Sequence, residues 1–346
     1  MNDIDFDSLC KGINNSSLPS LRNIYNDLNI RHGTKQEKDQ QITIITPDFD
    51  SSLYLIEEFM RYIQQSTRLP FQFEPDSSID DQRLALLLRQ VDHWVSEYKP
   101  FFKYSTYVTL FFEFSLSLPV SFPKRFSLRD LVMGKSMAEW GNQFVEQIRQ
   151  ALHSVKFKDR LRHREENARR SFSSSLRYVQ HLFEQYSRLL VVRMDFALKR
   201  NSNDLEEPLD RILDYFSKLR TKMKRRVGVF RYLVGYIAHL EYSLVKGHHL
   251  HAIFFFNGNR VRNAYALSLM IGNLWRQITD NLGIYFNTHM KSAQYTCPAI
   301  GMIHRSDEKK RCCLAYVIWY ITKLDQQLMY KYHDKQRVFF RGEIKK

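Results

Sequence analysis

Cysteine is scarce in this sequence, with four residues in a chain of 346. So few cysteines cannot build the disulfide framework of a small secreted domain. The N-terminal segment also lacks the basic stretch and following apolar stretch that mark a secretory signal. The longest apolar run, Cys312 to Ile321, is too short to cross a bilayer and is bounded by Lys and Arg. These absences predict a cytoplasmic protein that has no membrane partner.

Acidic residues are outnumbered by basic ones. The chain has 52 Lys and Arg against 37 Asp and Glu, which gives a net charge of +15. This excess favours a polyanionic partner, because basic side chains neutralise phosphates and release counterions. Charge alone does not distinguish DNA from RNA or an anionic membrane. Hydrophobic residues make up 44% of the chain, which excludes global disorder and allows a sizeable core.

The length of the chain suits two domains of ~100–200 residues each. We expect a polar, loosely ordered segment at 1–45, a mainly helical domain of unknown role at 46–165 and an α+β domain at 171–341. The highly charged segment 156–170 marks the boundary and predicts a solvated helix or linker, or else an arm that binds DNA. Within the helical domain, the β-branched and aromatic residues at 104–118 predict a strand.

From residue 171 onward, helical and strand periodicities alternate. The expected order is a helix at 171–187, a strand at 188–198, a helix through 209–223, hairpin strands at 234–243 and 249–256, a helix at about 260–279, short strands, and a final helix at about 308–328. This order predicts an α+β fold in which helices pack on a mostly antiparallel sheet.

The hairpin carries three residues that could share one face, Glu241, His249 and His251, here named the hairpin trio. Side chains alternate between the two faces of a strand, so the two histidines point the same way. A loop of three or five residues places Glu241 on that face, whereas an even loop does not. Two imidazoles and a carboxylate suit Mg²⁺ or Mn²⁺ holding a phosphate oxygen. The alternative is a pair of histidines on a solvated face. His248 is expected to be solvated in the turn.

The final predicted helix carries two tyrosines beside an apolar stripe. Tyr316, Tyr320 and Lys323 follow one line of the helix at spacings of four and three. A phenol is a poor nucleophile because its pKa is about 10. A neighbouring cation such as Lys323 and a metal-polarised phosphorus can lower the barrier to its attack. The alternative is that both tyrosines are ordinary packing residues at the edge of the helix.

The combination of these two motifs resembles the HUH endonucleases, which are named for two histidines on either side of a hydrophobic residue. Here the histidine pair precedes the sequence YITK that begins at Tyr320. Replication initiators have this order, whereas conjugative relaxases place the tyrosine first. The sequence YITKLDQQ and its distance from the hairpin are especially similar to the YagK/YfjJ C-terminal type of prophage and inovirus initiators, over roughly 171–341.

The resemblance implies a metal-dependent enzyme that nicks and rejoins single-stranded DNA at a replication origin. The hairpin trio would hold the metal, and Tyr320 would attack the scissile phosphate with the help of Lys323. A 5′-phosphotyrosine and a free 3′-hydroxyl that primes rolling-circle synthesis would result. Some initiators use two tyrosines, each followed by lysine three residues later. Trp319 stands where the lysine of Tyr316 would be, so Tyr316 departs from that pattern. Host replication proteins would be further partners.

Two other functions stay open. The chain could be a DNA-binding or regulatory protein whose nuclease centre is inactive, or a single-tyrosine transposase that uses the same chemistry. Asp195, on the same strand face as Arg193, could assist the metal or be a solvated strand residue. The remaining candidates lack regular zinc spacing and are expected to be structural: Cys297, His304, Cys312 and Cys313.

Overall fold

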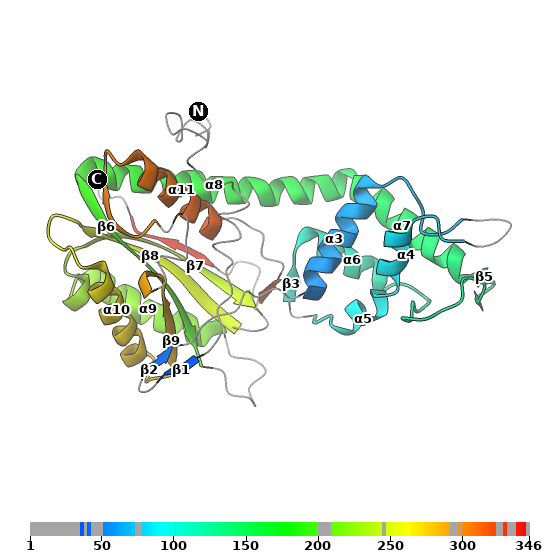
Figure 1. Cartoon of the computed structure of the whole chain (residues 1–346), viewed down its shortest axis with the longest axis horizontal. Coiled ribbons are helices and arrows are strands. Elements are labelled where there is room, and N and C mark those ends of the chain that lie inside the picture. The colour runs from blue at the N-terminus through cyan, green and yellow to red at the C-terminus, as the bar shows by residue number, and fades with distance from the viewer. Residues whose placement is uncertain are drawn as a thin grey trace. The chain divides into compact units, whose positions relative to one another are not determined.

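The computed structural model divides the chain into two compact units, each described here by itself (Figure 1). One unit comprises 49–166 and 325–331, and the other comprises 1–48, 167–324 and 332–346. The structure describes residues 51–72, 78–100, 102–199, 209–243, 247–290, 297, 299–322 and 337–343, with the backbone of three short strands at 35–37, 40–42 and 328–330. Among these residues, no helix combines the length and the apolar character that a membrane span requires.

The unit around residues 49–166 is mainly helical, as predicted. The aromatic rings of Phe59, Trp94 and Phe111 pack together in its core. The ring centroids of Phe59 and Trp94 are 5.8 Å apart, and those of Trp94 and Phe111 are 5.6 Å apart. The helices are α3 Ser51–Gln65, α4 Gln82–Leu88, α5 Val91–Ser96, α6 Thr106–Ser115, α7 Met137–His153 and the first part of α8 Val155–Gln185. The charged segment 156–170 is part of α8, which continues without the break expected before residue 171.

The predicted strand at 104–118 is wrong. Only β3, Phe102–Tyr104, is extended, and α6 follows it directly. Ser105 caps α6 by accepting a hydrogen bond from the backbone N–H of Val108 at 3.3 Å. Most residues of α6 are buried, so packing against other helices outweighs the strand propensity of its aromatic and β-branched residues.

The second unit is built on a six-stranded sheet in which every pairing is antiparallel. The strand order is β10-β6-β8-β7-β12, and β9 also pairs with β6. The strands are β6 Arg188–Leu198, β7 Leu233–Ser243, β8 Gly247–Asn257, β9 Gly283–Asn287, β10 Gly301–His304 and β12 Phe339–Arg341. The predicted α+β class is therefore confirmed.

Two helical layers cover the sheet. Figure 1 shows α8 and α11, Glu308–Thr322, on one side of the sheet, with α9, Leu209–Arg225, and α10, Ala264–Ile278, on the other. Odd-numbered strand residues such as Val191 and Ile253 pack with α8 and α11. On β6, on β8 and in the part of β7 after Gly235, even-numbered residues pack with α9 and α10. Because the hairpin trio is odd-numbered, it lies on the face covered by α8 and α11.

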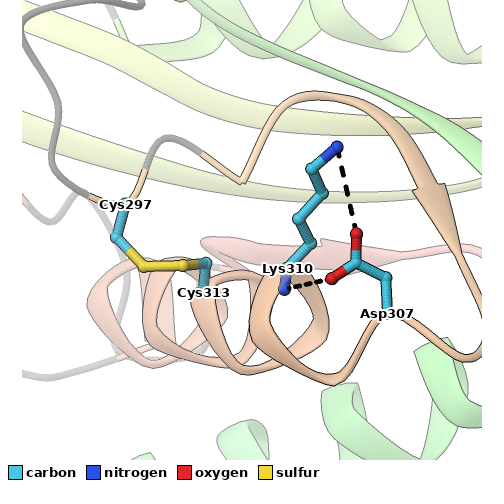
Figure 2. Close-up of a disulfide and its surroundings, with 4 residues drawn as sticks. All are labelled: Cys297, Asp307, Lys310 and Cys313. Carbon is cyan, nitrogen blue, oxygen red and sulfur yellow. Dashed lines mark hydrogen bonds and ion pairs between the residues drawn. A yellow bond between two sulfur atoms is a disulfide. The ribbon is translucent and has the colours of Figure 1, made fainter. Parts of the chain in front are cut away.

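A disulfide between Cys297 and Cys313 joins the segment before β10 to α11 (Figure 2). Figure 2 also shows Asp307, whose Oδ1 accepts a hydrogen bond from the backbone N–H of Lys310 at 3.0 Å, as a residue that caps a helix N-terminus does. Scarcity of cysteine therefore did not exclude a disulfide between Cys297 and Cys313. The two bonds fix the beginning of α11 and so the helix that carries Tyr320.

Gly272 on α10 lies so close to Tyr285 of β9 that an added Cβ would overlap its ring. In an open helix, replacing Gly by Ala stabilises by ~1 kcal/mol. We expect Gly272→Ala to lower the free energy of unfolding by ~1–3 kcal/mol instead, because Tyr285 must move. Thermal or urea unfolding measures the change. The neighbouring exposed residue gives the control, since Asn273→Ala should not destabilise, and equal stability of both variants would contradict this packing.

Candidate metal centre

The register of the hairpin brings the trio together. Glu241 pairs with His249, and His239 pairs with His251, across β7 and β8. The strands end at Ser243 and begin again at Gly247, which leaves a connection of three residues. The odd loop that the sequence required for a shared face is therefore present.

The ligand atoms of the trio converge on one point. Oε2 of Glu241 lies 3.1 Å from Nε2 of His251 and 3.7 Å from Nε2 of His249. All three ligand atoms lie within 4.8 Å of one another. Adjacent ligands of an octahedral ion with ~2.1 Å bonds are ~3 Å apart, so small side-chain adjustments would suffice. Both histidines are buried, and the trio could hold a metal ion.

Hydrogen bonds on the far side of each imidazole fix its orientation. Nδ1–H of His249 donates to the carbonyl of Gly247 at 3.1 Å, and Nδ1–H of His251 donates to Oδ1 of Asp195 at 2.6 Å. Each Nε2 is thereby directed towards Glu241, which is the arrangement that metal-binding histidines require. Asp195 is buried and supports His251, so the interpretation of this residue as solvated is wrong.

Two other histidines differ from expectation. His248 belongs to β8, is buried, and packs with its ring centroid 4.8 Å from that of Tyr242, so its predicted place in a solvated turn is wrong. His239 is also buried, and its Nδ1 lies 3.3 Å from Oε1 of Glu241. His239 had no predicted role. Its position opposite His251 was the signal that could have identified it.

The charges in this cluster are strongly coupled. Burial raises the pKa of Glu241, but the adjacent His251 and His239 outweigh burial and hold that pKa well below its usual value. Burial lowers the pKa of His251, but the carboxylates of Asp195 and Glu241 outweigh it and raise the pKa to about 9. Without metal at neutral pH, His251 is therefore protonated beside two carboxylates, and an arriving cation must displace that proton.

We expect metal affinity to depend on pH for this reason. A metal ion binds only neutral imidazole, so protons compete with it below the pKa of about 9 that His251 has without metal. The apparent affinity for Mn²⁺ should rise by up to about tenfold per pH unit from neutral pH and level off above that pKa. Calorimetric titration at several pH values measures the slope. The same affinity at pH 7 and pH 8.5 would contradict proton displacement.

Asp195→Asn tests the support of His251. We expect ~10–100-fold weaker Mn²⁺ binding at about pH 8.5, because the carboxylate no longer orients the ring. The loss should be smaller at neutral pH, since the substitution also removes a charge that raises the pKa of His251. Asp214→Asn on the exposed side of α9 is the matched control. Unchanged affinity at both pH values would assign Asp195 a packing role only.

Tyr320 lies beside the hairpin trio. The centroid of its ring is 6.2 Å from that of His251, and the guanidinium carbon of Arg193 is 5.7 Å from the Tyr320 centroid. Tyr320 is partly exposed, whereas Tyr316, one turn earlier, is buried in the core formed by α8, α11 and the sheet. The predicted position of Tyr316 at a helix edge is therefore wrong, because the residue is enclosed in that core.

The end of α11 also differs from the prediction. The described helix ends at Thr322, and Leu328 begins β11, Leu328–Tyr330, which pairs with β3. The helix therefore does not extend to Leu328. Lys323, the predicted cation of the tyrosine motif, lies outside the described residues.

This domain is therefore an antiparallel sheet whose hairpin could hold a metal ion, with Tyr320 of α11 next to that hairpin. The family model of the YagK/YfjJ C-terminal domain matches residues 151–341. Because the match covers more than half of the chain, the protein belongs to this family, which confirms that resemblance. Searches of curated proteins and of solved structures found no match.

Proposed function

We propose that this protein is an HUH-type endonuclease that nicks single-stranded DNA through Tyr320 and so initiates rolling-circle replication of a phage or mobile element. The observation that carries the proposal is the proximity of Tyr320 to the hairpin trio, with 6.2 Å between the ring centroids of Tyr320 and His251. The trio lies on β7 and β8, whereas Tyr320 lies on α11, so the fold brings together residues that are far apart in the sequence. Attack by a tyrosine on a metal-bound phosphate requires the tyrosine and the metal site to be close together.

The reaction follows from these positions. When bound to the trio, Mn²⁺ or Mg²⁺ supplies positive charge that polarises the scissile phosphate. Tyr320 Oη forms a bond to phosphorus while the bond from phosphorus to the 3′ oxygen breaks. The phenolic proton passes to solvent, and the departing 3′ oxygen takes up a proton to become a hydroxyl. The DNA 5′ end remains on Tyr320 as a phosphotyrosine, and rejoining is the same exchange in reverse.

The surroundings of Tyr320 fit this role better than a purely structural one. Tyr320 is partly exposed, whereas the chemically identical Tyr316 is buried. The net charge of +15 provides attraction for the phosphates of a single strand. Origin DNA is therefore the proposed substrate, with host replication proteins as partners of the product.

A covalent adduct is the direct test. The full chain would be incubated with a pool of single-stranded oligonucleotides and Mn²⁺ or Mg²⁺, then separated under denaturing conditions and analysed by mass spectrometry. We expect a metal-dependent adduct on the peptide that contains Tyr320 and a new free 3′-hydroxyl. Binding of the oligonucleotides without any adduct in either metal would favour a DNA-binding protein with an inactive centre.

A further inference from the structure

Arg193 is a buried cation in the middle of the sheet. It lies on β6, on the same face as Asp195 and the hairpin trio, and only 4% of its surface is exposed. Its Nε and Nη1 atoms are buried and have no hydrogen-bond partner in the described part of the chain. A guanidinium remains charged at any ordinary pH, and burying a charge whose donors are unsatisfied is unfavourable. Burial of Arg193 therefore does not serve folding stability, which indicates a functional role for this side chain.

The position of Arg193 indicates that reason. Its guanidinium carbon lies 5.7 Å from the centroid of the Tyr320 ring, and the same ring lies 6.2 Å from that of His251. Tyr320 is therefore flanked by a permanent cation and by a member of the hairpin trio. An anion brought to Tyr320 would lie close to the permanent positive charge of Arg193.

We propose that Arg193 binds the scissile phosphate of the DNA and neutralises the charge that develops on it during attack by Tyr320. This inference rests on the proposed function. The planar guanidinium presents donors that match two oxygens of one phosphate, which a lysine ammonium does not. Arg193 would thus supply the positive charge that the sequence motif assigns to Lys323. In this interpretation, Nε and Nη1 of Arg193, which have no hydrogen-bond partner in the described part of the chain, donate to the phosphate when DNA binds.

Stability measurements test the anion site without any activity. Arg193→Met removes the charge and keeps an unbranched side chain that can fill the space. We expect it to unfold at a temperature roughly 2–4 °C higher than wild type, because a buried charge with two unsatisfied donor atoms is lost. Inorganic phosphate should raise the unfolding temperature of wild type but not that of Arg193→Met. Arg188→Met is the matched control on the same strand, since the Arg188 guanidinium is exposed and already bonded to Asn259.

Cleavage measurements test the role in the reaction. Arg193→Met should slow adduct formation ~10²–10³-fold, as expected when one donor to a transition state is removed, while Mn²⁺ affinity is unchanged. Arg193→Lys should recover part of the rate. Adduct formation by Arg193→Met at the wild-type rate would overturn the inference and leave the proposed function intact. Absence of any adduct with wild type would overturn the proposed function. The rise in unfolding temperature with inorganic phosphate would then test only whether Arg193 binds an anion. Equal phosphate shifts in wild type and Arg193→Met would refute the anion site.

Discussion

Tyr320→Phe is expected to abolish the covalent protein–DNA adduct while leaving the affinity for single-stranded DNA within about twofold of wild type. The substitution removes only the nucleophilic oxygen, and the ring can keep its contacts with His251 and Arg193. The net charge of +15, which attracts phosphates, is also unchanged. Denaturing gels measure the adduct, and fluorescence anisotropy with a labelled oligonucleotide measures the affinity.

Tyr316→Phe is the matched control, because it makes the same change one helical turn away. Tyr316 is buried in the core, so we expect a loss of stability of ~1 kcal/mol at most and cleavage near the wild-type rate. The reverse result, an adduct with Tyr320→Phe and none with Tyr316→Phe, would move the nucleophile to Tyr316 and preserve the enzyme class. Adducts with both variants would require a nucleophile elsewhere in the chain.

Removing one imidazole from the hairpin trio should eliminate both metal binding and cleavage. His249→Ala is the most informative variant, because it leaves the contacts of His251 with Asp195 and Glu241 in place. We expect Mn²⁺ binding below detection by calorimetry and no adduct, since two ligands do not hold the ion at the phosphate. Retention of the wild-type unfolding temperature would show that the fold is intact.

His304→Ala is the control for this variant. His304 is an exposed histidine at the end of β10 that bonds to Ser306, so Mn²⁺ affinity should not change. Wild-type Mn²⁺ affinity in His249→Ala would place the ion elsewhere. Loss of Mn²⁺ binding with full cleavage would remove the metal from the mechanism and leave the tyrosine chemistry standing.

The hairpin trio could be predicted because it depends only on local rules. Side chains alternate along β7 and β8, and the short loop sets which residues of the two strands face each other. Asp195 and Arg193 could not be assigned in this way. Both lie on β6, and their contact with the trio follows from the pairing of β6 with β8, such as that of Asp195 with His251, which no local pattern specifies.

The difference between the two tyrosines was also beyond the sequence. Tyr316 and Tyr320 lie four residues apart and therefore share a helix face. Long-range packing in the core shared by α8, α11 and the sheet buries Tyr316, whereas Tyr320 is partly exposed and lies beside the trio. Similarly, the aromatic residues of α6 predicted a strand, and burial among other helices made them helical. Both errors arise where long-range packing outweighs local preference.

The three-residue connection between β7 and β8 restricts how the length of this protein can vary. One inserted residue at residues 244–246 would shift the pairing of Glu241 with His249 by one position and turn one strand over. On that strand, the metal ligands would move to the opposite face of the sheet and the apolar side chains would take their place, unless a β-bulge absorbed the extra residue. Two inserted residues would keep both faces. Viable chains with this centre should therefore differ at this turn in steps of two residues, so that the parity of a short loop is itself a determinant of metal binding.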